Sequence, residues 1–419
     1  MVPRVKGTQD FLDLTLYNFL IEKTRRHLQK AAFTEIATPI LEHTELFKRS
    51  LGLHTEVVSK EMYTVVTGHE EEGDTKGLCL RPEATAPTMR AFFNNNIEER
   101  PWKVFSHGPL FRHERPQRGR YRQFQQVSIE MIGAASIAHD AELIALLDRF
   151  FTDDLKLPSY GLLINFLGTP QDRMNYKQVL KDFLNKQDNL PEKIISLKET
   201  NILRIFDLKD PACKEALKNA PVITDYLCEE SQKEWALLQS LLQQLSVSFS
   251  CEPRLVRGLD YYNKTVFEFV SSDLGAQSTF CGGGRYDNLS QELGEEKAVP
   301  SLGAAFGVER VAIILEQHAA ALNIPQKPAL QMIMPMSTQQ QALALICADA
   351  MRGNGICCDV ILDEASMKSM MRKADKAGAQ HVLIIGEDEV NNNYITVKNM
   401  MTGASEKVPQ SNLITYFKH

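Results

Sequence analysis

Five arginines lie close together in one short stretch of the chain, FRHERPQRGRYRQFQQVSIE, at positions 111–130. Guanidinium groups packed so densely need anions to satisfy them, and phosphate is the anion whose geometry arginine matches best. The stretch therefore predicts a loop that binds phosphate. A solvated basic hairpin is the alternative that the stretch alone leaves open. The five arginines are Arg112, Arg115, Arg118, Arg120 and Arg122.

The end of the same stretch alternates between apolar and polar residues from Phe124 onward. A β-strand shows this pattern because its side chains point alternately to opposite faces. The apolar set is Val127, Ile129 and Met131, and the polar set is Gln126, Ser128 and Glu130. The apolar set fits the core face of a sheet. The polar set would then line a floor beneath the arginine-rich loop.

Two glycine-containing stretches later in the chain carry further candidate residues. In LVRGLDYY, at 255–262, Arg257 stands beside Gly258 and is followed by Tyr261 and Tyr262. A glycine in this setting indicates a backbone that passes close to a ligand. In GGGRYD, at 282–287, the glycines predict a flexible turn that ends in an arginine and Tyr286. A glycine run alone is weak support for a site, because tight turns explain most such runs.

Two junctions between a strand and a helix complete the candidates. GAAFGVER, at 303–310, runs from an apolar strand into a helix and puts Arg310 in the first helical turn. Free backbone N–H groups and the helix dipole favour an anion there. RPEAT, at 81–85, ends a strand and enters a helix. Glu83 and Thr85 could belong to a site or could cap that helix, and the sequence leaves both interpretations open.

Hydrophobic periodicity predicts the elements that position these residues. In the first 325 residues we expect helices at 14–30, 44–51, 85–93, 141–151 and 233–245, and strands at 35–40, 62–66, 78–81 and 161–167. Pro39 implies that its strand lies at an edge or an interface. A charged hairpin is expected at 69–76. Residues 171–230 are charged and loop-broken, without glycine or a strand signal, and we interpret them as a helical insertion.

A separate α/β module is expected beyond Pro325 and Pro328. Its strands are predicted at 330–334, 356–362, 381–385 and 394–397, and its helices at 338–352 and 366–377. The second helix carries the basic residues Lys368, Arg372, Lys373 and Lys376. A solvated helix face is the default interpretation of these four, and this helix is also the first place to look for a surface that binds RNA.

Composition bounds the class of protein. At 419 residues the chain is too long for one ordinary core, so two or three domains are expected. With 43% hydrophobic and 24% charged residues it has the composition of a soluble globular protein. Its net charge of −6 gives no overall basic field. A nucleic acid would therefore have to bind local patches such as the arginine-rich loop.

Targeting and metal-binding signals are lacking. The N-terminus, MVPRVKGTQD, has no apolar core of a signal peptide, and no apolar run approaches the ~20 residues of a membrane helix. Eight cysteines are scattered without a CxxC pair, which argues against a zinc site or a disulfide framework and is consistent with a reducing cytoplasm. The histidines show no ligand spacing, so no metal held by the protein alone is expected.

Together these stretches resemble the histidyl-tRNA synthetase family of class II aminoacyl-tRNA synthetases. TPILEHTELF, at 38–47, resembles class II motif 1, FRHERPQRGRYRQFQQ resembles motif 2, and GAAFGVERV resembles motif 3. RGLDYY and GGGRYD resemble the two histidine-specific signatures, and this pair is highly specific. The resemblance covers the whole chain, including the C-terminal module, which is similar to the anticodon-binding domain that several class II enzymes share.

The resemblance implies an α+β protein. Residues 1–325 would form a class II catalytic domain, in which helices flank an antiparallel sheet, with the helical insertion at about 171–230. Residues 328–419 would form an α/β anticodon-binding domain. A homodimer is implied through motif 1, because the family uses the strand that carries Pro39 at its interface.

The implied activity is that of a histidine–tRNA ligase, with ATP, Mg²⁺ bound with ATP, L-histidine and tRNA(His) as ligands and no membrane partner. The histidine carboxylate attacks the α-phosphate of ATP and releases pyrophosphate, and the histidyl-adenylate then esterifies the terminal ribose of the tRNA. By resemblance, Arg112 holds the α-phosphate and Arg310 the far phosphates. Arg257 lies between the amino-acid carboxylate and the α-phosphate. Glu114 also belongs to the implied ATP site.

The resemblance further implies where histidine and tRNA bind. Histidine would be bound by Glu83, Thr85, Gln126, Glu130, Arg257, Tyr261, Tyr262 and Tyr286. The first three would receive the α-ammonium group, Glu130 and Tyr262 would bracket the imidazole, and the other two tyrosines would wall the pocket. Arg115 and Gln117, at the tip of the arginine-rich loop, would reach the acceptor end of the tRNA, where the extra 5′ guanosine would be the target.

Three rival functions follow from the same residues. A synthetase-like regulatory subunit of ATP phosphoribosyltransferase would bind histidine without charging tRNA, but Arg112, Arg257, Arg310 and a complete C-terminal module are all present here. A class II enzyme for threonine, proline or glycine is disfavoured by RGLDYY and GGGRYD. A stand-alone α/β binding module is excluded by length.

Overall fold

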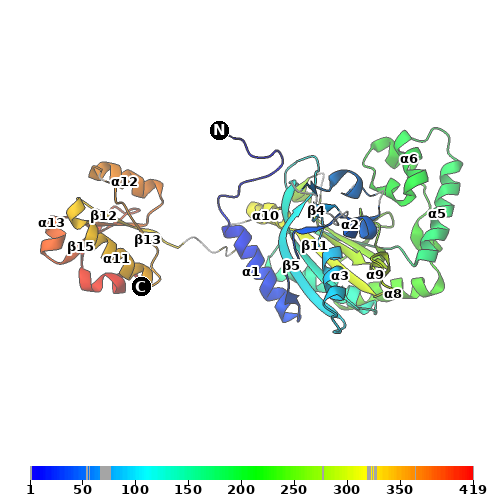
Figure 1. Ribbon diagram of the computed structural model, residues 1–419, viewed down its shortest axis with the longest axis horizontal. Coiled ribbons are helices and arrows are strands. Elements are labelled where there is room, and N and C mark those ends of the chain that lie inside the picture. Colours follow the sequence, from blue (N-terminus) through cyan, green and yellow to red (C-terminus); the bar gives the residue numbers. More distant parts are fainter. Residues whose placement is uncertain are drawn as a thin grey trace. The chain divides into compact units, whose positions relative to one another are not determined.

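In a computed structural model of the chain, the arginine-rich stretch joins two long antiparallel strands, β5 (Trp102–Phe111) and β6 (Gln123–Ile132). The structure describes residues 2–52, 55, 57–66, 77–275, 278–318, 322, 324, 328–363 and 365–418. The hairpin expected at 69–76 lies outside the described residues. The chain divides into two compact units, Met1–Ile324 (unit 1) and Pro325–His419 (unit 2), which Figure 1 shows in sequence colours.

Unit 1 is built on an eight-stranded sheet in the order β1-β5-β6-β11-β10-β9-β7-β8. Neighbouring strands are antiparallel except for the short outer pairs β1 with β5 and β7 with β8. The remaining strands are β1 (Thr34–Glu35), β7 (Gly161–Phe166), β8 (Ser250–Cys251), β9 (Asn263–Val270), β10 (Thr279–Arg285) and β11 (Ser301–Gly307). A smaller sheet has the order β2-β4-β3, with β2 (Leu41–His43), β4 (Leu78–Leu80) and β3 (Thr64–Val65).

Four helices bury their apolar stripes against one face of the large sheet. They are α1 (Thr15–Lys30), α4 (Ala138–Arg149), α8 (Glu229–Gln244) and α10 (Val308–Gln317). Their residues share one core cluster with Val127, Ile129 and Met131 of β6, each at most 1% exposed. The alternation predicted for this strand is therefore confirmed, and Gln126, Ser128 and Glu130 lie on the opposite face. An antiparallel-rich sheet flanked by helices confirms the predicted α+β fold.

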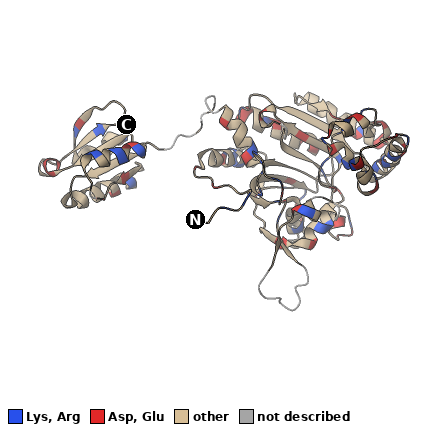
Figure 2. Cartoon of the chain, turned by 90° about the horizontal axis from the view of Figure 1, so that it is seen from above, with Lys and Arg blue, Asp and Glu red and all other residues tan. Residues whose placement is uncertain are grey.

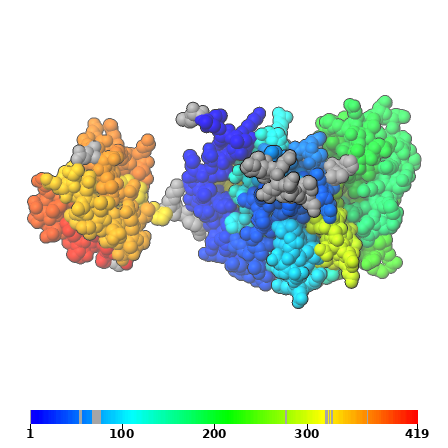
Figure 3. Space-filling model, viewed as in Figure 1, coloured from blue at the N-terminus to red at the C-terminus, as the bar shows by residue number. Residues whose placement is uncertain are grey.

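A second core cluster lies on the other side of unit 1 and joins the insertion to the sheet. The helices α2 (Thr44–Leu51), α3 (Thr85–Asn94) and α9 (Leu289–Glu292) contribute to this side, as do the insertion helices α5 (Pro170–Asn185), α6 (Glu192–Thr200) and α7 (Pro211–Ala216). No strand occurs between residues 170 and 249, all of which the structure describes. Leu180, Ile194 and Ile205 of the insertion pack in the same cluster as Tyr261 and Tyr262. The insertion appears green in Figure 3, on the opposite side of the visible face from the dark-blue N-terminal residues.

Unit 2 contains a five-stranded sheet in the order β13-β12-β14-β15-β16. The strands β13 (Cys358–Val360), β12 (Gln331–Pro335) and β14 (His381–Ile385) are parallel, and β15 (Tyr394–Asn399) and β16 (Ser405–Pro409) continue antiparallel. Its helices are α11 (Gln341–Gly353), α12 (Met367–Lys376), α13 (Glu387–Asn391) and α14 (Leu413–Phe417). β16 has no counterpart among the predicted strands. In Figure 2 acidic and basic residues are interspersed along both units.

Two predicted elements of unit 1 are wrong. The strand expected at 35–40 ends at Glu35; Ile36 still donates to the Phe105 carbonyl, but the chain then leaves the sheet and the Thr38 carbonyl accepts from the Arg81 guanidinium at 2.8 Å. The turn expected at Gly282–Gly284 is instead the buried end of β10, paired on both sides. In the described residues, no helix is long and apolar enough to cross a membrane.

Candidate active site

Two adjoining cavities of about 190 and 290 Å³ open over the polar face of β6, β10 and β11. These three strands are direct neighbours in the order β6-β11-β10, so their polar faces form one floor. Residues common to both cavities are Arg112, Glu114, Arg120, Gln126, Arg257, Gly282 and Ala305. The two cavities are therefore one cleft with two compartments, which we call the arginine compartment and the tyrosine compartment.

Glycines in the floor make room for charged side chains. A Cβ atom on Gly282 would lie 2.5 Å from Nη1 of Arg257, and one on Gly303 of β11 would overlap the Glu130 carboxyl. A Cβ atom on Gly283 would overlap the Gly303 carbonyl oxygen. Real Cβ atoms do not approach neighbours so closely, so any larger residue would displace the side chain or the strand. The GGG sequence thus serves close packing within a sheet.

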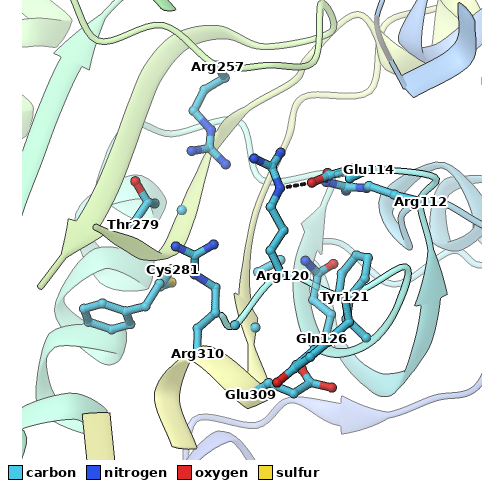
Figure 4. A pocket seen from close by; sticks show the side chains of 16 residues that line it. Arg112, Glu114, Arg120, Tyr121, Gln126, Arg257, Thr279, Cys281, Glu309 and Arg310 are labelled. Carbon is cyan, nitrogen blue, oxygen red and sulfur yellow. Dashed lines mark ion pairs between the residues drawn. The ribbon is translucent and has the colours of Figure 1, made fainter. Parts of the chain in front are cut away.

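The arginine compartment gathers guanidinium groups from three separate segments. Arg112 and Arg120 come from the loop between β5 and β6, Arg257 from the segment before β9, and Arg310 from the first turn of α10. Figure 4 shows the side chains of Arg120, Arg257 and Arg310 directed toward the same space. Burial lowers the pKa of Arg112 and Arg310, because desolvation penalises their charge. A bound polyanion would relieve this penalty.

Carboxylates hold two of these arginines in place. Glu268 of β9 accepts a hydrogen bond from Nη1 of Arg257 and another from the Thr279 hydroxyl at 2.7 Å. Burial, the largest single effect, lowers the pKa of Arg257, but the Glu268 carboxylate together with Tyr262 and Tyr261 outweighs it. The net shift of the pKa is therefore upward, and the guanidinium stays charged. Glu114, expected at the ATP site, is ion-paired with Arg120 (dashed in Figure 4) and lies 4.0 Å from Arg112.

The tyrosine compartment contains most of the residues expected to bind histidine. Glu83, Thr85, Gln126, Arg257, Tyr261 and Tyr262 line it. The rings of Tyr261 and Tyr262 lie 4.6 Å apart between centroids, and Tyr286 meets Tyr261 edge-on at 5.6 Å. Tyr286 itself is 1% exposed and is not among the residues that line the cavity. It supports the aromatic wall from behind.

Glu83 caps the start of α3, which is one of the two interpretations that the sequence leaves open. Its carboxylate accepts hydrogen bonds from the backbone N–H groups of Thr85, at 2.6 Å, and Ala86, at 2.9 Å, at the start of α3. Burial raises the pKa of this carboxyl, against the opposing effect of those two bonds and of Arg112. Because Glu83 also lines the cavity, the same carboxylate is available to an incoming cation.

Glu130 lies just beneath the cavity, with both carboxyl oxygens engaged. One accepts from the Thr85 hydroxyl at 2.7 Å and the other from the Tyr286 hydroxyl. Burial raises the pKa of Glu130 to about 8, so the carboxyl is protonated near neutral pH when no cation is bound. A cationic or hydrogen-bonding ring placed over it would favour the ionised form. The two buried carboxyls, Glu83 and Glu130, thus suit a ligand with more than one basic nitrogen.

Models of known protein families match nearly all of the chain. Residues 15–311 match the model described as histidyl-tRNA synthetase, and residues 331–419 match the model described as anticodon binding domain.

The chain belongs to the histidyl-tRNA synthetase family.

Relatives named histidine–tRNA ligase cover the whole chain. The protein of Clostridioides difficile is 38% identical over 99% of this chain and 98% of its own length. The protein of Thermosipho melanesiensis is 39% identical over the same shares. Among solved structures, the apo histidyl-tRNA synthetase of S. aureus is 32% identical with a TM-score of 0.80 and full coverage of both chains. A structure from Bacillus halodurans named as a regulatory subunit or histidyl-tRNA synthetase is 18% identical, with a TM-score of 0.64 over 92% of this chain and 98% of that one, and shares the fold.

Residues implied by the family resemblance to contact tRNA lie apart from the cleft. Arg115 and Gln117 are exposed on the loop between β5 and β6 and line neither compartment. The backbones of Gln117 and Arg120 exchange two hydrogen bonds, which shape the loop tip. Arg122 donates to the carbonyls of Glu114 and Lys6, so this arginine supports the loop rather than a ligand.

Three charged residues of the tyrosine compartment were missed from the sequence. Glu61, Arg204 and Asp207 line the tyrosine compartment and come from two irregular helical turns, Val57–Glu61 and Ile202–Asp207. Neither turn carries a glycine or an alternating pattern that would mark a site. Arg120 was one of the five arginines noted in the sequence, but no ligand was assigned to it.

The arginine of GGGRYD is structural. Arg285 is 1% exposed, pairs with the equally buried Asp140 of α4, and donates to the carbonyl of Ala134 at 2.6 Å and of Ser136 at 3.0 Å. Asp287 accepts from it at 3.2 Å. A guanidinium whose donors are all used within the protein holds the sheet against α4 and does not bind substrate.

Proposed function

We propose that this histidine–tRNA ligase forms histidyl-adenylate in the two-compartment cleft of unit 1, with ATP in the arginine compartment and L-histidine in the tyrosine compartment. The observation that carries this proposal is the position of Arg257, which lines both compartments. A carboxylate in one compartment and a phosphate in the other would meet at its guanidinium. Joining those two groups is the chemistry of amino-acid activation.

The first step brings an anion to a polyanion. The histidine carboxylate oxygen bonds to the α-phosphorus as the bond from that phosphorus to the bridging oxygen breaks, and pyrophosphate leaves. Arg112 holds the α-phosphate, Arg310 the far phosphates, and Arg257 the developing charge between carboxylate and phosphorus. Cations fixed in advance stabilise such a transition state without reorganising during the reaction. Glu268 keeps Arg257 oriented for this role.

Magnesium is proposed to enter with the nucleotide. Among the described residues no group of three or more His, Cys, Asp or Glu side chains gathers to hold a metal. Glu114 lines the cleft, and its carboxylate is the protein group that would contact the metal ion bound with the nucleotide. The ion would neutralise phosphate charge during the displacement.

The tyrosine compartment accounts for the proposed selection of histidine. Glu83, Thr85 and Gln126 receive the α-ammonium group, and Glu130 and Tyr262 bind the two imidazole nitrogens. Tyr261 forms the wall, with Tyr286 supporting it from behind. Buried groups that need a hydrogen-bonding ring are left unsatisfied by an apolar isostere. Such a site can reject the isostere by about 10⁴–10⁵ without an editing domain.

Transfer to tRNA is proposed to involve residues outside the cleft. We propose that Arg115 and Gln117 contact the acceptor end of tRNA(His), its extra 5′ guanosine included, and that unit 2, residues 325–419, binds the anticodon. We also propose a homodimer formed through the motif 1 region and a cytoplasmic location. The eight cysteines are free thiols.

Histidine-dependent exchange of pyrophosphate into ATP, followed by charging of tRNA(His), tests the function. Both activities are expected from the purified chain. Exchange driven by another amino acid would overturn the specificity. Histidine binding without exchange or charging would favour a regulatory subunit instead.

A further inference from the structure

The segment at 255–262, which carries Arg257, belongs to no helix or strand. Three residues of the helical insertion bind it at three points. Arg204 donates to the Gly258 carbonyl, Asn201 donates to the Asp260 carboxylate at 2.9 Å, and Arg173 of α5 donates to the Tyr262 carbonyl at 2.6 Å. A loop without its own ladder of backbone hydrogen bonds depends on such side-chain bonds for a fixed shape.

The insertion residues that make these bonds are themselves anchored. Asn201 and Arg204 flank Ile202, and Ile205 follows; these two isoleucines are 4% and 0% exposed. Both pack in the core cluster that includes Leu255, Tyr261 and Tyr262. Apolar contact and polar bonds therefore tie the same turn to the same segment.

Arg204 is the residue on which these contacts converge. Its side chain is 13% exposed, and its Nε atom lies 3.6 Å from the Asp260 carboxylate in addition to the bond from Nη2 to Gly258. The Gly258 carbonyl and the Asp260 carboxylate lie on either side of Leu259, and Gly258 directly follows Arg257 in the chain. A guanidinium that holds two points two residues apart restricts the backbone between and beside them.

We propose that Arg204, assisted by Asn201, is a positioning residue for the activation step: the insertion holds the 255–262 segment so that Arg257 and the paired tyrosines face the cleft before substrates bind. This inference rests on the proposed function, in which Arg257 contacts the reacting groups. Without Arg204 the substrates would have to order the segment themselves. Misplacing a reacting group by about 1 Å costs about 10²-fold in rate.

The test compares Arg204→Ala with wild type in two independent measurements. One is histidine-dependent pyrophosphate exchange, giving kcat and KM for histidine. The other is hydrogen–deuterium exchange of the backbone amides at 256–262. We expect kcat/KM to fall by about 10²-fold, with KM raised and kcat lowered together, and the amides of the segment to exchange faster. Arg204→Lys, which retains a charge for Asp260, should recover part of the loss.

A double-mutant cycle with Asp260→Ala separates positioning from direct substrate contact. If Arg204 acts through the segment, the double variant should be little worse than the worse single variant, because both remove the same constraint. Lys193→Ala, which removes an exposed ion pair to Asp210 inside the insertion, is the matched control and should change neither measurement.

Three outcomes would overturn the inference. They are unchanged activity in Arg204→Ala, lost activity with unchanged amide exchange in the segment, and additive losses in the cycle. If Arg204→Ala does not fold, as thermal unfolding would show, Arg204→Lys and Asn201→Ala carry the same test. A wild-type protein without exchange activity would instead refute the proposed function, while the amide measurement would still report whether the insertion holds the segment.

Discussion

The buried carboxyl of Glu130 on β6 accepts a hydrogen bond from the hydroxyl of Tyr286, which directly follows β10. Glu130 is 2% exposed and Tyr286 1%. Thr85, at the start of α3, donates to the other carboxyl oxygen at 2.7 Å. Three segments more than 40 residues apart in sequence thus meet at one acid group. Glu130 is therefore set in orientation by the protein before any ligand binds.

Replacing Glu130 by glutamine should change how stability depends on pH. Burial raises the folded-state pKa of Glu130 to about 8, from an ordinary value of 4.5. Between these values the native state binds more protons than the unfolded state, so this group's contribution to stability falls as pH rises through that window. Glu130→Gln cannot ionise and should lose less stability than wild type between pH 5 and pH 8. Urea unfolding at both pH values measures the difference.

The matched control for this prediction is Glu98→Gln on an exposed position. Its pH dependence should follow that of wild type. Equal pH dependence in wild type and Glu130→Gln would show that Glu130 is not held protonated in the folded protein.

Removing the Arg257 guanidinium should separate binding from chemistry. Arg257→Ala should bind histidine nearly as wild type does, because the other groups of the tyrosine compartment remain. Pyrophosphate exchange should fall by about 10²–10³-fold, as when other preorganised transition-state donors are deleted. Calorimetric binding of histidine and the exchange assay give the two numbers. Unchanged exchange would contradict the role, and Arg26→Ala on the exposed face of α1 should leave both numbers unaltered.

Whether the sequence predicts a feature of this fold depends on whether the contacts that form the feature are local in sequence. The alternation of Val127, Ile129 and Met131 is a local pattern of period two, and it places these side chains correctly without knowledge of the rest of the fold. The helix 14–30 was equally accessible because its apolar stripe repeats locally. Such elements need no information beyond their own residues.

Other features depend on neighbours that are distant in sequence. Position 283 of β10 requires glycine because the backbone of Gly303 on β11 leaves no space for a Cβ atom, and nothing in GGGRYD distinguishes that requirement from a turn. Arg204 reaches the cleft because its turn packs against Tyr261 and Tyr262, which lie more than 50 residues later. A single sequence carries no local signal for either contact.

The close packing of the floor predicts a strong response to one added methyl group. Gly303→Ala would push a Cβ atom into the Glu130 carboxyl and to 2.8 Å from the Ile129 carbonyl oxygen. Overpacking of this kind costs about 1–3 kcal/mol of stability, and here it would also displace the group that binds imidazole. We expect a lower urea midpoint and weakened histidine binding. Gly353→Ala in unit 2, where a Cβ atom meets nothing within 4 Å, is the control and should be neutral or slightly stabilising.

Replacing Arg115 tests whether different arginines of the arginine-rich stretch contact ATP and tRNA. Its side chain is exposed and outside both compartments, whereas Arg112, three residues earlier, lines both. Arg115→Ala should therefore leave pyrophosphate exchange near the wild-type rate and reduce charging of tRNA(His), with a reduced dependence of charging on salt, since one phosphate contact is lost. Arg118→Ala, an exposed arginine of the same loop, tests whether any lost positive charge has this effect. Equal losses of exchange and charging in Arg115→Ala would place this residue in the adenylation chemistry. A loss of charging shared equally by Arg118→Ala would reduce its role to a general attraction for RNA.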